Sequence, residues 1–583
     1  MSLLTTASLV ITPNAGKEGT LFSVVPNTSL GDMSVVRATT ATRVNSAGLV
    51  ELVPYNLLSY SQDFSNAYWV GEPGNTITSN TTTAPDGTLT ADTFTATAGN
   101  GMNVHNFGSF ALADGTFTYS VYLKNNGTNL IEAYLFKIGI GFAARGEINF
   151  SAGTFTASIG TGSIENVGNG WFRVSLSNTY TSGSFTTGTL TTSTTGTRST
   201  FVWGAQLVEG SLPKDYQKTE TRLNIPRLDY SNGTCPSLLV EPQRTNLALY
   251  SEQFDNAYWG VSEATISANV TVAPNGTNTA DKLIESNTNA LHEVYSNTPF
   301  SLTSGIAYTK TIYAKSSERT QIALNFVTGG FGQGSSVIAN LTTGTLGTVT
   351  NYGGVTGSTA TITNVNNGWY RISITMTPVT TATFYADFSP ALNGAISYQG
   401  DGTSGLFIYG AQLEAGSYST SFIPTTSASV TRNADVISKN PSAFLGANTG
   451  SWFIDVEDYE FEIKGTNDPT TYIGDSTSNF IGFSAKVAAY NGIVITKRES
   501  GTVTIIFQNP LKSLKACFVW NGVSLKLFIN GSNVYTNNSF ANFAAWDTFE
   551  LNNSSRPASY NCNSSVLFPT AISDAEAITL TTV

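Results

Sequence analysis

The feature that most constrains this chain of 583 residues is an internal duplication. The segment NLLSYSQDFSNAYW at 56–69 recurs as NLALYSEQFDNAYW at 246–259. Because internal repeats are the signature of repeated structural units, we expect two homologous domains, at 54–222 and 244–426. Four further pairs of segments extend the match: 84–88 with 273–277, 122–124 with 313–315, 169–175 with 367–373, and 204–207 with 410–413.

The two copies also divide the rest of the chain. The offset between them grows from 190 residues at Trp69 and Trp259 to 206 residues at Gly204 and Gly410, so the second copy carries the longer loops. What remains is an N-terminal segment, two linkers and a third domain. We place these parts at 1–53, 223–243, 427–451 and 452–583.

Both copies have the residue pattern of β-strands. Residues 117–123 and 308–314 alternate bulky apolar side chains with small or polar ones, as half-buried antiparallel strands do. Asn126-Gly127 and Asn169-Gly170 supply the positive φ angles that tight turns need. The sequence therefore predicts an all-β chain of three antiparallel β-sandwich domains with jelly-roll topology, after a short extended N-terminal segment.

The third domain shows two local signals. Leu525, Leu527 and Ile529 alternate between two Asn-Gly turns, which predicts a hairpin. Ser573 followed three residues later by Glu576 is a capping box, which predicts the start of a short helix.

Composition excludes several classes of partner. The chain has 28 basic and 39 acidic residues, a net charge of −11, and a pI near 4.8. An acidic chain of this kind disfavours nucleic acids and anionic membrane surfaces. No segment reaches the roughly 18 consecutive apolar residues of a membrane span, so we expect no membrane insertion. The absence of a basic residue before Lys17 argues against a secretion signal, and we expect the protein to be made and kept in a cytoplasm.

The sequence carries few groups for catalysis. Only two histidines occur, His105 and His292; they do not align in the duplication, and we interpret both as incidental surface or loop residues. The common nucleophile, zinc and nucleotide-binding motifs are absent. We therefore predict no catalytic, cofactor-binding or metal-binding residues and no cofactor, although paired carboxylates remain open.

Aromatic residues are the best binding candidates, because a sugar ring stacks on Trp or Tyr while its hydroxyl groups bond to polar side chains. A Trp that recurs at the same place in two copies is also typical of a sandwich core, and this is the favoured alternative. The glycan-contact candidates are Tyr68, Trp69, Tyr258, Trp259, Trp520, Tyr535, Trp546 and Tyr560.

Several of these segments carry family resemblances. The opening 56–69 segment, the Tyr-Leu-Lys strand and the Gly-Trp-Phe-Arg strand resemble carbohydrate-binding modules of the jelly-roll type. Residues 84–92 and 410–416 resemble modules of tailed-bacteriophage structural proteins, and the segments 36–45, 225–230 and 239–246 resemble their linkers. Residues 567–578 are similar to the end of concanavalin-like or laminin-G-like sandwiches. The family implies a structural calcium ion, but Gln206 and Gln412 stand where an acidic pair is common.

The resemblance implies a non-enzymatic bacteriophage virion protein, a tail-fibre or receptor-binding fibre subunit on the virion surface. Its N-terminal segment would attach to other virion proteins, and its domains would contact host cell-surface polysaccharide by weak multivalent binding. Fibre subunits of this kind are usually trimers. A head-fibre or capsid-decorating protein is the alternative, and a polysaccharide depolymerase is a third, for which no long β-helix repeat is present.

Overall fold

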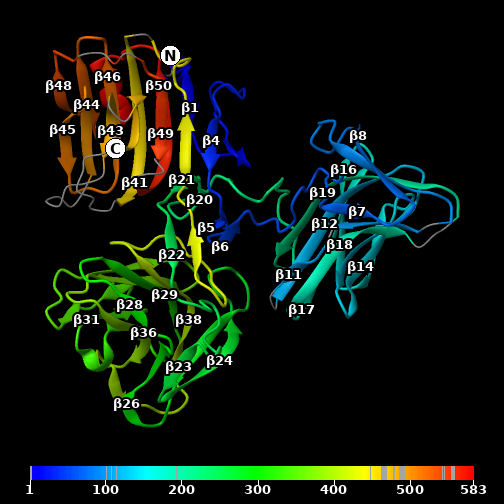
Figure 1. Cartoon of the computed structure of the whole chain (residues 1–583), viewed down its shortest axis with the longest axis horizontal. Helices are drawn as coiled ribbons and strands as arrows, with labels where there is room; N and C mark the ends of the chain where they lie inside the picture. The colour runs from blue at the N-terminus through cyan, green and yellow to red at the C-terminus, as the bar shows by residue number, and fades with distance from the viewer. Residues whose placement is uncertain are drawn as a thin grey trace. The chain divides into compact units, whose positions relative to one another are not determined.

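The computed structural model describes residues 3–583 except 100, 107, 113–114, 192–194, 447, 461–468, 477–478, 485–492, 541–542, 544 and 553–557. These described residues form antiparallel strands almost throughout, with one α-helix, α1 (Asp574–Thr581), and two short 3-10 turns, η1 (Leu3–Thr6) and η2 (Gly329–Phe331). The expected all-β sandwich fold is confirmed. The chain forms two compact units, one of residues 53–223 and the other of residues 1–52 and 224–583 (Figure 1).

The first unit is a two-sheet sandwich made by the first copy of the duplication, here called repeat 1. One sheet has the order β16-β17-β12-β19-β9-β8, and the other has the order β15-β14-β13-β18-β10-β7 with β11 beside β18. The strands are β7 (Trp69–Gly71), β8 (Asn75–Thr82), β9 (Ala91–Ala96), β10 (Met102–Asn106), β11 (Phe110–Leu112), β12 (Gly115–Asn125), β13 (Leu130–Lys137), β14 (Gly141–Asn149), β15 (Thr154–Ile159), β16 (Thr161–Gly168), β17 (Trp171–Tyr180), β18 (Gly183–Thr191) and β19 (Arg198–Glu209).

The second copy, repeat 2, has the same order in both sheets and adds three short strands, β26, β33 and β37. Its sheets have the orders β34-β35-β29-β38-β25-β24 and β32-β31-β30-β36-β27-β23, with β28 beside β36 and β33 beside β31. The strands are β23 (Trp259–Ser262), β24 (Ala264–Thr271), β25 (Ala280–Glu285), β26 (Asn289–Leu291), β27 (Glu293–Ser296), β28 (Phe300–Leu302), β29 (Tyr308–Ser316), β30 (Gln321–Val327), β31 (Gly334–Asn340), β32 (Thr345–Leu346), β33 (Thr350–Tyr352), β34 (Thr359–Asn364), β35 (Trp369–Met376), β36 (Ala382–Ala391), β37 (Ser397–Gln399) and β38 (Gly405–Ala415).

A buried aspartate fixes the opening segment in both repeats. Asp92 accepts hydrogen bonds from the backbone N–H groups of Phe64 and Asn80, both at 2.9 Å. In repeat 2, Asp281 accepts the equivalent pair from Phe254 and Asn269. These bonds satisfy backbone donors that burial would otherwise leave unpaired, which explains why the segment is repeated so faithfully.

The third sandwich is built from more of the chain than residues 452–583. Short strands from the N-terminal segment and from both linkers extend its two sheets, so these segments are not free connections. The sheet orders are β20-β21-β50-β41-β46-β47-β48 with β1 beside β50, and β2-β3-β4-β40-β49-β42-β43-β44-β45. The strands are β1 (Leu9–Ile11), β2 (Gly16–Lys17), β3 (Thr20–Leu21), β4 (Met33–Val36), β20 (Leu228–Asp229), β21 (Ser237–Val240), β40 (Val436–Lys439), β41 (Gly450–Glu460), β42 (Pro469–Ser476), β43 (Asn479–Ser484), β44 (Ile493–Glu499), β45 (Thr502–Asn509), β46 (Leu514–Trp520), β47 (Leu525–Ile529), β48 (Ser532–Asn537), β49 (Thr548–Asn552) and β50 (Ser559–Phe568).

Two further strand pairs complete the connections. They are β5 (Ala41–Val44) with β6 (Val50–Val53), and β22 (Arg244–Asn246) with β39 (Val430–Arg432). The pair β26 and β37 lies within repeat 2.

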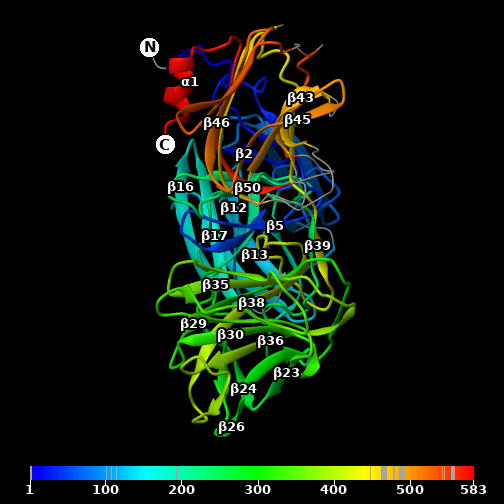
Figure 2. The same cartoon turned by 90° about the vertical axis from the view of Figure 1, so that its left-hand side faces the viewer.

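Both local predictions in the third sandwich are confirmed. Leu525, Leu527 and Ile529 of β47 are buried in the core, and the strand pairs with β46 and β48. The Ser573 side chain caps α1 by accepting from the backbone of Glu576, whose carboxylate in turn accepts from the backbone of Ser573. The helix packs beside β46 (Figure 2).

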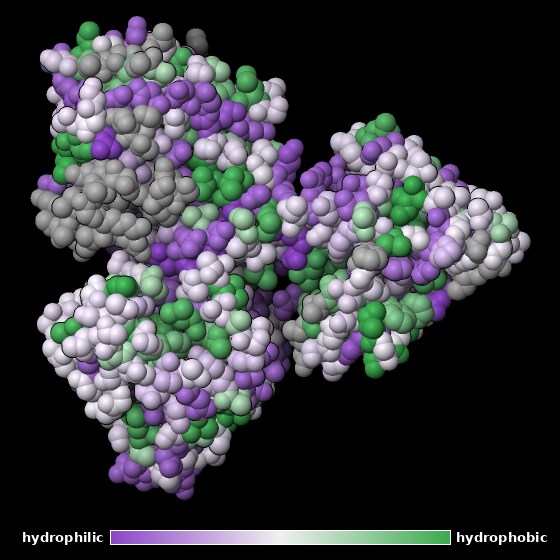
Figure 3. All heavy atoms as spheres, in the orientation of Figure 1, coloured by the Kyte–Doolittle hydropathy of each residue, from purple (hydrophilic) through white to green (hydrophobic). Residues whose placement is uncertain are grey.

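The surface reflects the low charge of the chain. On the face shown in Figure 3, many residues have the pale colours of intermediate hydropathy, as expected where only 11% of residues are charged. None of the helices in the described ranges is long and apolar enough to cross a membrane.

A buried ionic cluster joins the connecting segments of the larger unit. Its members are Arg37, Arg227, Glu241, Arg432 and Asp435, and each side chain is almost fully buried. Arg37 pairs with Asp435 at 2.6 Å, and Arg227 pairs with both Asp435 and Glu241. Arg432 pairs with Glu241 at 2.6 Å. The N-terminal segment and both linkers therefore meet at one point.

The cluster keeps its carboxylates ionised. Burial alone would raise the pKa of Glu241, but Arg432 and Arg227 hold that pKa far below its usual value. The pKa of Asp435 is also lowered, because Arg227 and Arg37 outweigh the cost of burial. A carboxylate whose pKa is lowered on folding stabilises the fold above its unfolded pKa, and this stability is lost as pH falls below about 4.

We predict that Asp435→Asn destabilises the larger unit by about 3 to 5 kcal/mol, because it leaves buried arginines without a partner. Calorimetry of the full chain should show one unfolding transition shifted to lower temperature and the transition of repeat 1 unchanged. The control is Glu132→Gln, which breaks the partly exposed pair with Arg145 and should cost roughly 1 kcal/mol or less. Equal effects of the two substitutions would contradict the prediction.

Candidate functional site

Most of the aromatic residues predicted to contact glycans belong to the core. Trp69 is 4% exposed and Trp259 is 5% exposed, and each indole N–H donates to a backbone carbonyl, of Tyr60 and of Tyr250. Their neighbours Tyr68 and Tyr258 are partly buried against the same cores. A stacking platform must be open to a ligand, and these two tryptophans are not. They have the core role that was the favoured alternative.

The same correction applies to the third sandwich. Trp520, Trp546 and Tyr560 are buried in its core. The rings of Trp520 and Trp546 stack with centroids 4.3 Å apart. Tyr535 is only partly buried against this core. Recurrence in the sequence and a high aromatic content thus identified packing residues rather than an open groove.

Two half-buried aromatic residues, Phe136 and Phe142, lie on the outer face of one sheet of repeat 1. Ile131, Ala133 and Leu135 of β13 point into the core, so Tyr134 and Phe136 lie on the opposite face. Phe142 of β14 contacts both of these rings edge-on, with centroids 5.5 and 5.4 Å apart. Tyr134 is nevertheless only 4% exposed, so Phe136 and Phe142 are the rings that a ligand could reach.

Polar groups surround this aromatic group. The Tyr134 hydroxyl donates to Asn103 at 2.8 Å. The Arg145 guanidinium lies over the Phe142 ring, 4.5 Å from its centroid, and is held there by Glu132. An aromatic surface bordered by hydrogen-bonding groups is the combination that recognises a sugar.

Repeat 2 places an aromatic pair at the same end of the equivalent sheet. Phe331, in the turn between β30 and β31, contacts Tyr352 of β33 with centroids 5.2 Å apart, and both rings are half-buried. Phe331 has a φ of 56°, a backbone conformation that favours glycine and costs a bulky residue about 1 kcal/mol or more.

Sequence reasoning missed these residues for identifiable reasons. In repeat 1 the sequence did contain a signal for an outward-facing aromatic residue, because residues 134–136 are all bulky and must place side chains on both faces of the strand. In repeat 2 neither the turn position of Phe331 nor its contact with Tyr352 follows from local pattern.

The same face of repeat 2 carries a carboxylate at a position where repeat 1 has an uncharged residue. Strand register makes Asp387 equivalent to Gly188 and Asn325 equivalent to Tyr134. Burial raises the pKa of Asp387 to about 7, although Lys310 opposes the shift, and burial also raises the pKa of Glu293. Glu293 also raises the pKa of Asp387, so the two carboxylates influence each other on this face.

Lys310 crosses the core of repeat 2 beneath this face. It is equivalent to Tyr119 of repeat 1, is fully buried, and lies 4.6 Å from the centroid of Phe388. Its Nζ donates to the backbone carbonyls of Asn325 at 2.6 Å and Asp387 at 2.8 Å. Desolvation lowers the pKa of Lys310 to about 7.

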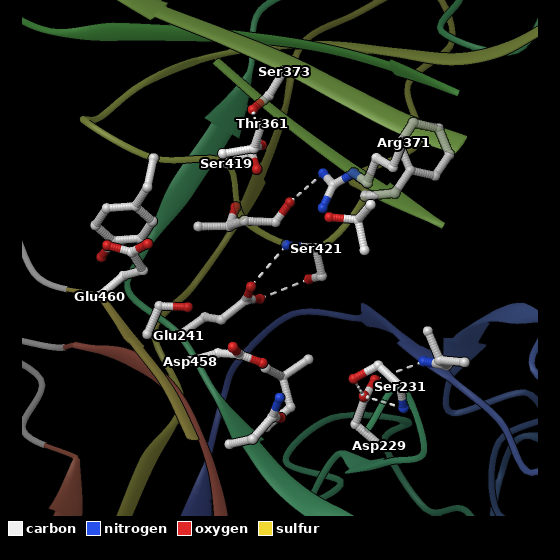
Figure 4. A pocket seen from close by; sticks show the side chains of 18 of the residues that line it. Asp229, Ser231, Glu241, Thr361, Arg371, Ser373, Ser419, Ser421, Asp458 and Glu460 are labelled. Atoms are coloured by element: carbon white, nitrogen blue, oxygen red, sulfur yellow. Dashed lines mark hydrogen bonds between the residues drawn. The ribbon is translucent and has the colours of Figure 1, made fainter. Parts of the chain in front are cut away.

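A cavity of about 620 Å³ lies in the larger unit (Figure 4). Hydroxyl groups of Thr361, Ser373 and Ser419 line it, together with the carboxylates of Asp458 and Glu460. The aromatic residues at its wall that are described, Tyr313, Phe422, Tyr418 and Tyr459, are buried. The cavity therefore offers hydrogen bonds without an open stacking surface, and the sheet faces are the stronger candidates.

The two histidines lie in different surroundings. His292 lies in the short connection between β26 and β27, so it is a loop residue but not a surface residue, because it is fully buried. Its two ring nitrogens face the carbonyl oxygens of Glu263 and Tyr398 at 2.6 and 3.2 Å. His105 lies on β10 near Glu72. Among the described residues, no group of three or more His, Cys, Asp or Glu side chains could hold a metal ion.

Comparison with known proteins gives structural similarity only. No protein-family model matches the chain, and no curated protein matches it. One similar structure is domain 4 of AbnA, an extracellular GH43 arabinanase from Geobacillus stearothermophilus, in complex with arabinotriose. Its sequence is 14% identical to this chain, and the match covers 28% of this chain and 82% of the AbnA domain, with a TM-score of 0.22.

Two other solved structures are similar. The tandem CBM22-1-CBM22-2 domain of Xyn10C from Paenibacillus barcinonensis is 13% identical, covers 62% of this chain and 98% of its own, and has a TM-score of 0.19. The GH43 protein BlXynB from Bacillus licheniformis is 8% identical, with coverage of 86% and 99% and a TM-score of 0.17. Carbohydrate-binding modules are thus among the similar structures, but TM-scores of this size carry no argument about what this chain binds.

We predict that Lys310 makes the stability of repeat 2 depend on pH. The pKa of this lysine is about 7 when folded and 10.5 by its ordinary value, so the unfolded state binds more protons between these limits. The free energy of unfolding therefore rises as pH increases from 7 to 10. In Lys310→Met the rise should be smaller by on the order of 3 kcal/mol, measured by urea unfolding. Lys315→Met, on the same strand, is the control and should keep the rise. An undiminished rise in Lys310→Met would refute the assignment.

Proposed function

We propose that this chain is a glycan-contacting structural protein without a catalytic centre. The observation that carries this proposal is the equivalent placement of a half-buried aromatic pair in both repeats. The pairs are Phe136 with Phe142 and Phe331 with Tyr352. Two equivalent surfaces on one chain favour weak contacts that act together, because linked sites raise avidity by roughly 10² to 10⁴ without a tight single site.

We further propose a place for the protein on the virion of a tailed bacteriophage, as a tail-fibre or receptor-binding fibre subunit. This rests on the module and linker resemblances of the sequence. In this proposal host cell-surface polysaccharide is the ligand, other virion proteins bind the N-terminal part, and the subunit is a homotrimer. Immunogold electron microscopy of intact particles would locate the protein. Labelling confined to the head would favour the head-fibre alternative instead.

Glycan binding can be tested without disturbing the fold. We expect the full chain to bind host polysaccharide on a glycan array, and Phe142→Ala and Phe331→Ala each to weaken binding about fivefold, from loss of roughly 1 kcal/mol of stacking. The double variant should lose more than either single variant. Phe150→Ala is the matched control, because this half-buried ring contacts Phe172 of the other sheet instead.

Two results would count against the proposal. Equal binding by the double variant and the parent chain would remove the aromatic pairs from the site. Release of reducing ends from polysaccharide, abolished by Asp387→Asn, would instead make the protein a depolymerase acting through the carboxylates of repeat 2.

A further inference from the structure

A β-hairpin is docked on repeat 2. The hairpin consists of β5 and β6, and the backbone N–H of Val50 donates to the carbonyl of Pro274 at 3.0 Å. Val50 is 8% exposed and belongs to the same apolar cluster as Tyr313, Trp369 and Phe422. The contact is close, because a Cβ added to Gly276 would lie 2.8 Å from a Leu49 methyl group. Repeat 2 thus has a built receptor surface for an aliphatic hairpin.

Repeat 1 has the same surface without a hairpin on it. Its cluster of Ala84, Ala91, Tyr122, Trp171 and Trp203 matches that of repeat 2 but contains no counterpart of Val50 among the described residues. The duplication makes Pro85, Gly87 and Val167 equivalent to Pro274, Gly276 and Val365. A Cβ added at Gly87 or at Gly168 would meet nothing within 4 Å, and Leu89 in the same loop is 62% exposed.

The backbone carbonyl that accepts the hairpin's hydrogen bond in repeat 2 also has a counterpart in repeat 1. The carbonyl of Pro85 receives no hydrogen bond from the residues that the structure describes, whereas its counterpart on Pro274 is paired with Val50. An extended segment that arrived here would gain one backbone hydrogen bond and would cover aliphatic and aromatic surface, as in repeat 2.

The chain uses its own hairpins elsewhere. β5 and β6 precede repeat 1, with Arg43 paired to Glu51 at 2.9 Å, and they dock on repeat 2. β20 and β21 precede repeat 2, with Arg227 paired to Glu241, and they join the sheet of the third sandwich. Each hairpin therefore packs not on the domain that directly follows it in the chain, but on the next domain after that one. By this rule neither of these two hairpins serves repeat 1.

We propose that the surface of repeat 1 around Pro85, Gly87 and Val167 is a docking site for a β-hairpin of a partner protein. The partner's hairpin is of the same type as residues 41–53, with two aliphatic residues after a tight turn and an Arg–Glu pair between its strands. A second copy of this chain is a poorer occupant, because both of its hairpins are already packed within the larger unit.

The test uses the full chain and a backbone-cyclised peptide with the sequence of residues 40–54, whose strand pairing is first verified by NMR. We expect saturable binding by titration calorimetry, weakened at least about tenfold in Val167→Asp, which would bury a charge against the peptide. Leu89→Asp is a second variant, exposed enough to leave the fold intact, and should weaken binding in the same direction. Ile140→Asp, on an exposed turn of the same repeat, is the control and should bind like the parent chain.

Circular dichroism of each variant confirms that a loss of binding is not a loss of fold. Absence of peptide binding to the parent chain would overturn the proposal, and so would binding that neither Val167→Asp nor Leu89→Asp changes. Self-association of the parent chain that Val167→Asp abolishes, seen by sedimentation, would assign the surface to a second copy and would also overturn the partner assignment.

Discussion

The buried cluster of three arginines and two carboxylates governs the organisation of the larger unit. Burying unpaired charges is costly, so each guanidinium group requires the carboxylates that the other segments bring. Arg37 comes from the N-terminal segment, Arg227 and Glu241 from the first linker, and Arg432 and Asp435 from the second. The third sandwich is therefore assembled from segments hundreds of residues apart, and β1 near the start of the chain pairs with β50 near its end. A deletion of the C-terminal domain would remove support for the whole unit, which is why point substitutions test function more cleanly.

Much of the fold follows from local sequence pattern. The alternation around residues 117–123, the Asn-Gly turns and the capping box at Ser573 each depend on neighbouring residues, and each predicts its element correctly. The strands in the linkers cannot be predicted from local sequence pattern. Short strands such as Leu228–Asp229 are too brief to show a period, and their pairing is set by distant partners. Charged residues in a linker also look like solvated residues in sequence, and only the tertiary structure buries Arg227 with Glu241.

The candidate site was harder to predict, for a reason that lies in the duplication itself. Two copies of a domain retain in common what the fold requires, so recurrence selects core residues such as Trp69 and Trp259. Residues that serve binding are free to diverge. On the equivalent sheet faces, Tyr134 is replaced by Asn325 and Gly188 by Asp387, while Tyr119 inside the core is replaced by Lys310. The differences between the copies carry more functional information than their identities.

The same comparison shows where the two proposed surfaces lie on one scaffold. The sheet of repeat 2 that receives the hairpin and the sheet that carries Phe331 and Tyr352 are opposite layers of one sandwich. The proposed ligand contact would therefore not compete with the hairpin for surface. Repeat 1 has the equivalent two faces. Since each sandwich buries its own core, a face can change its partner without loss of the fold.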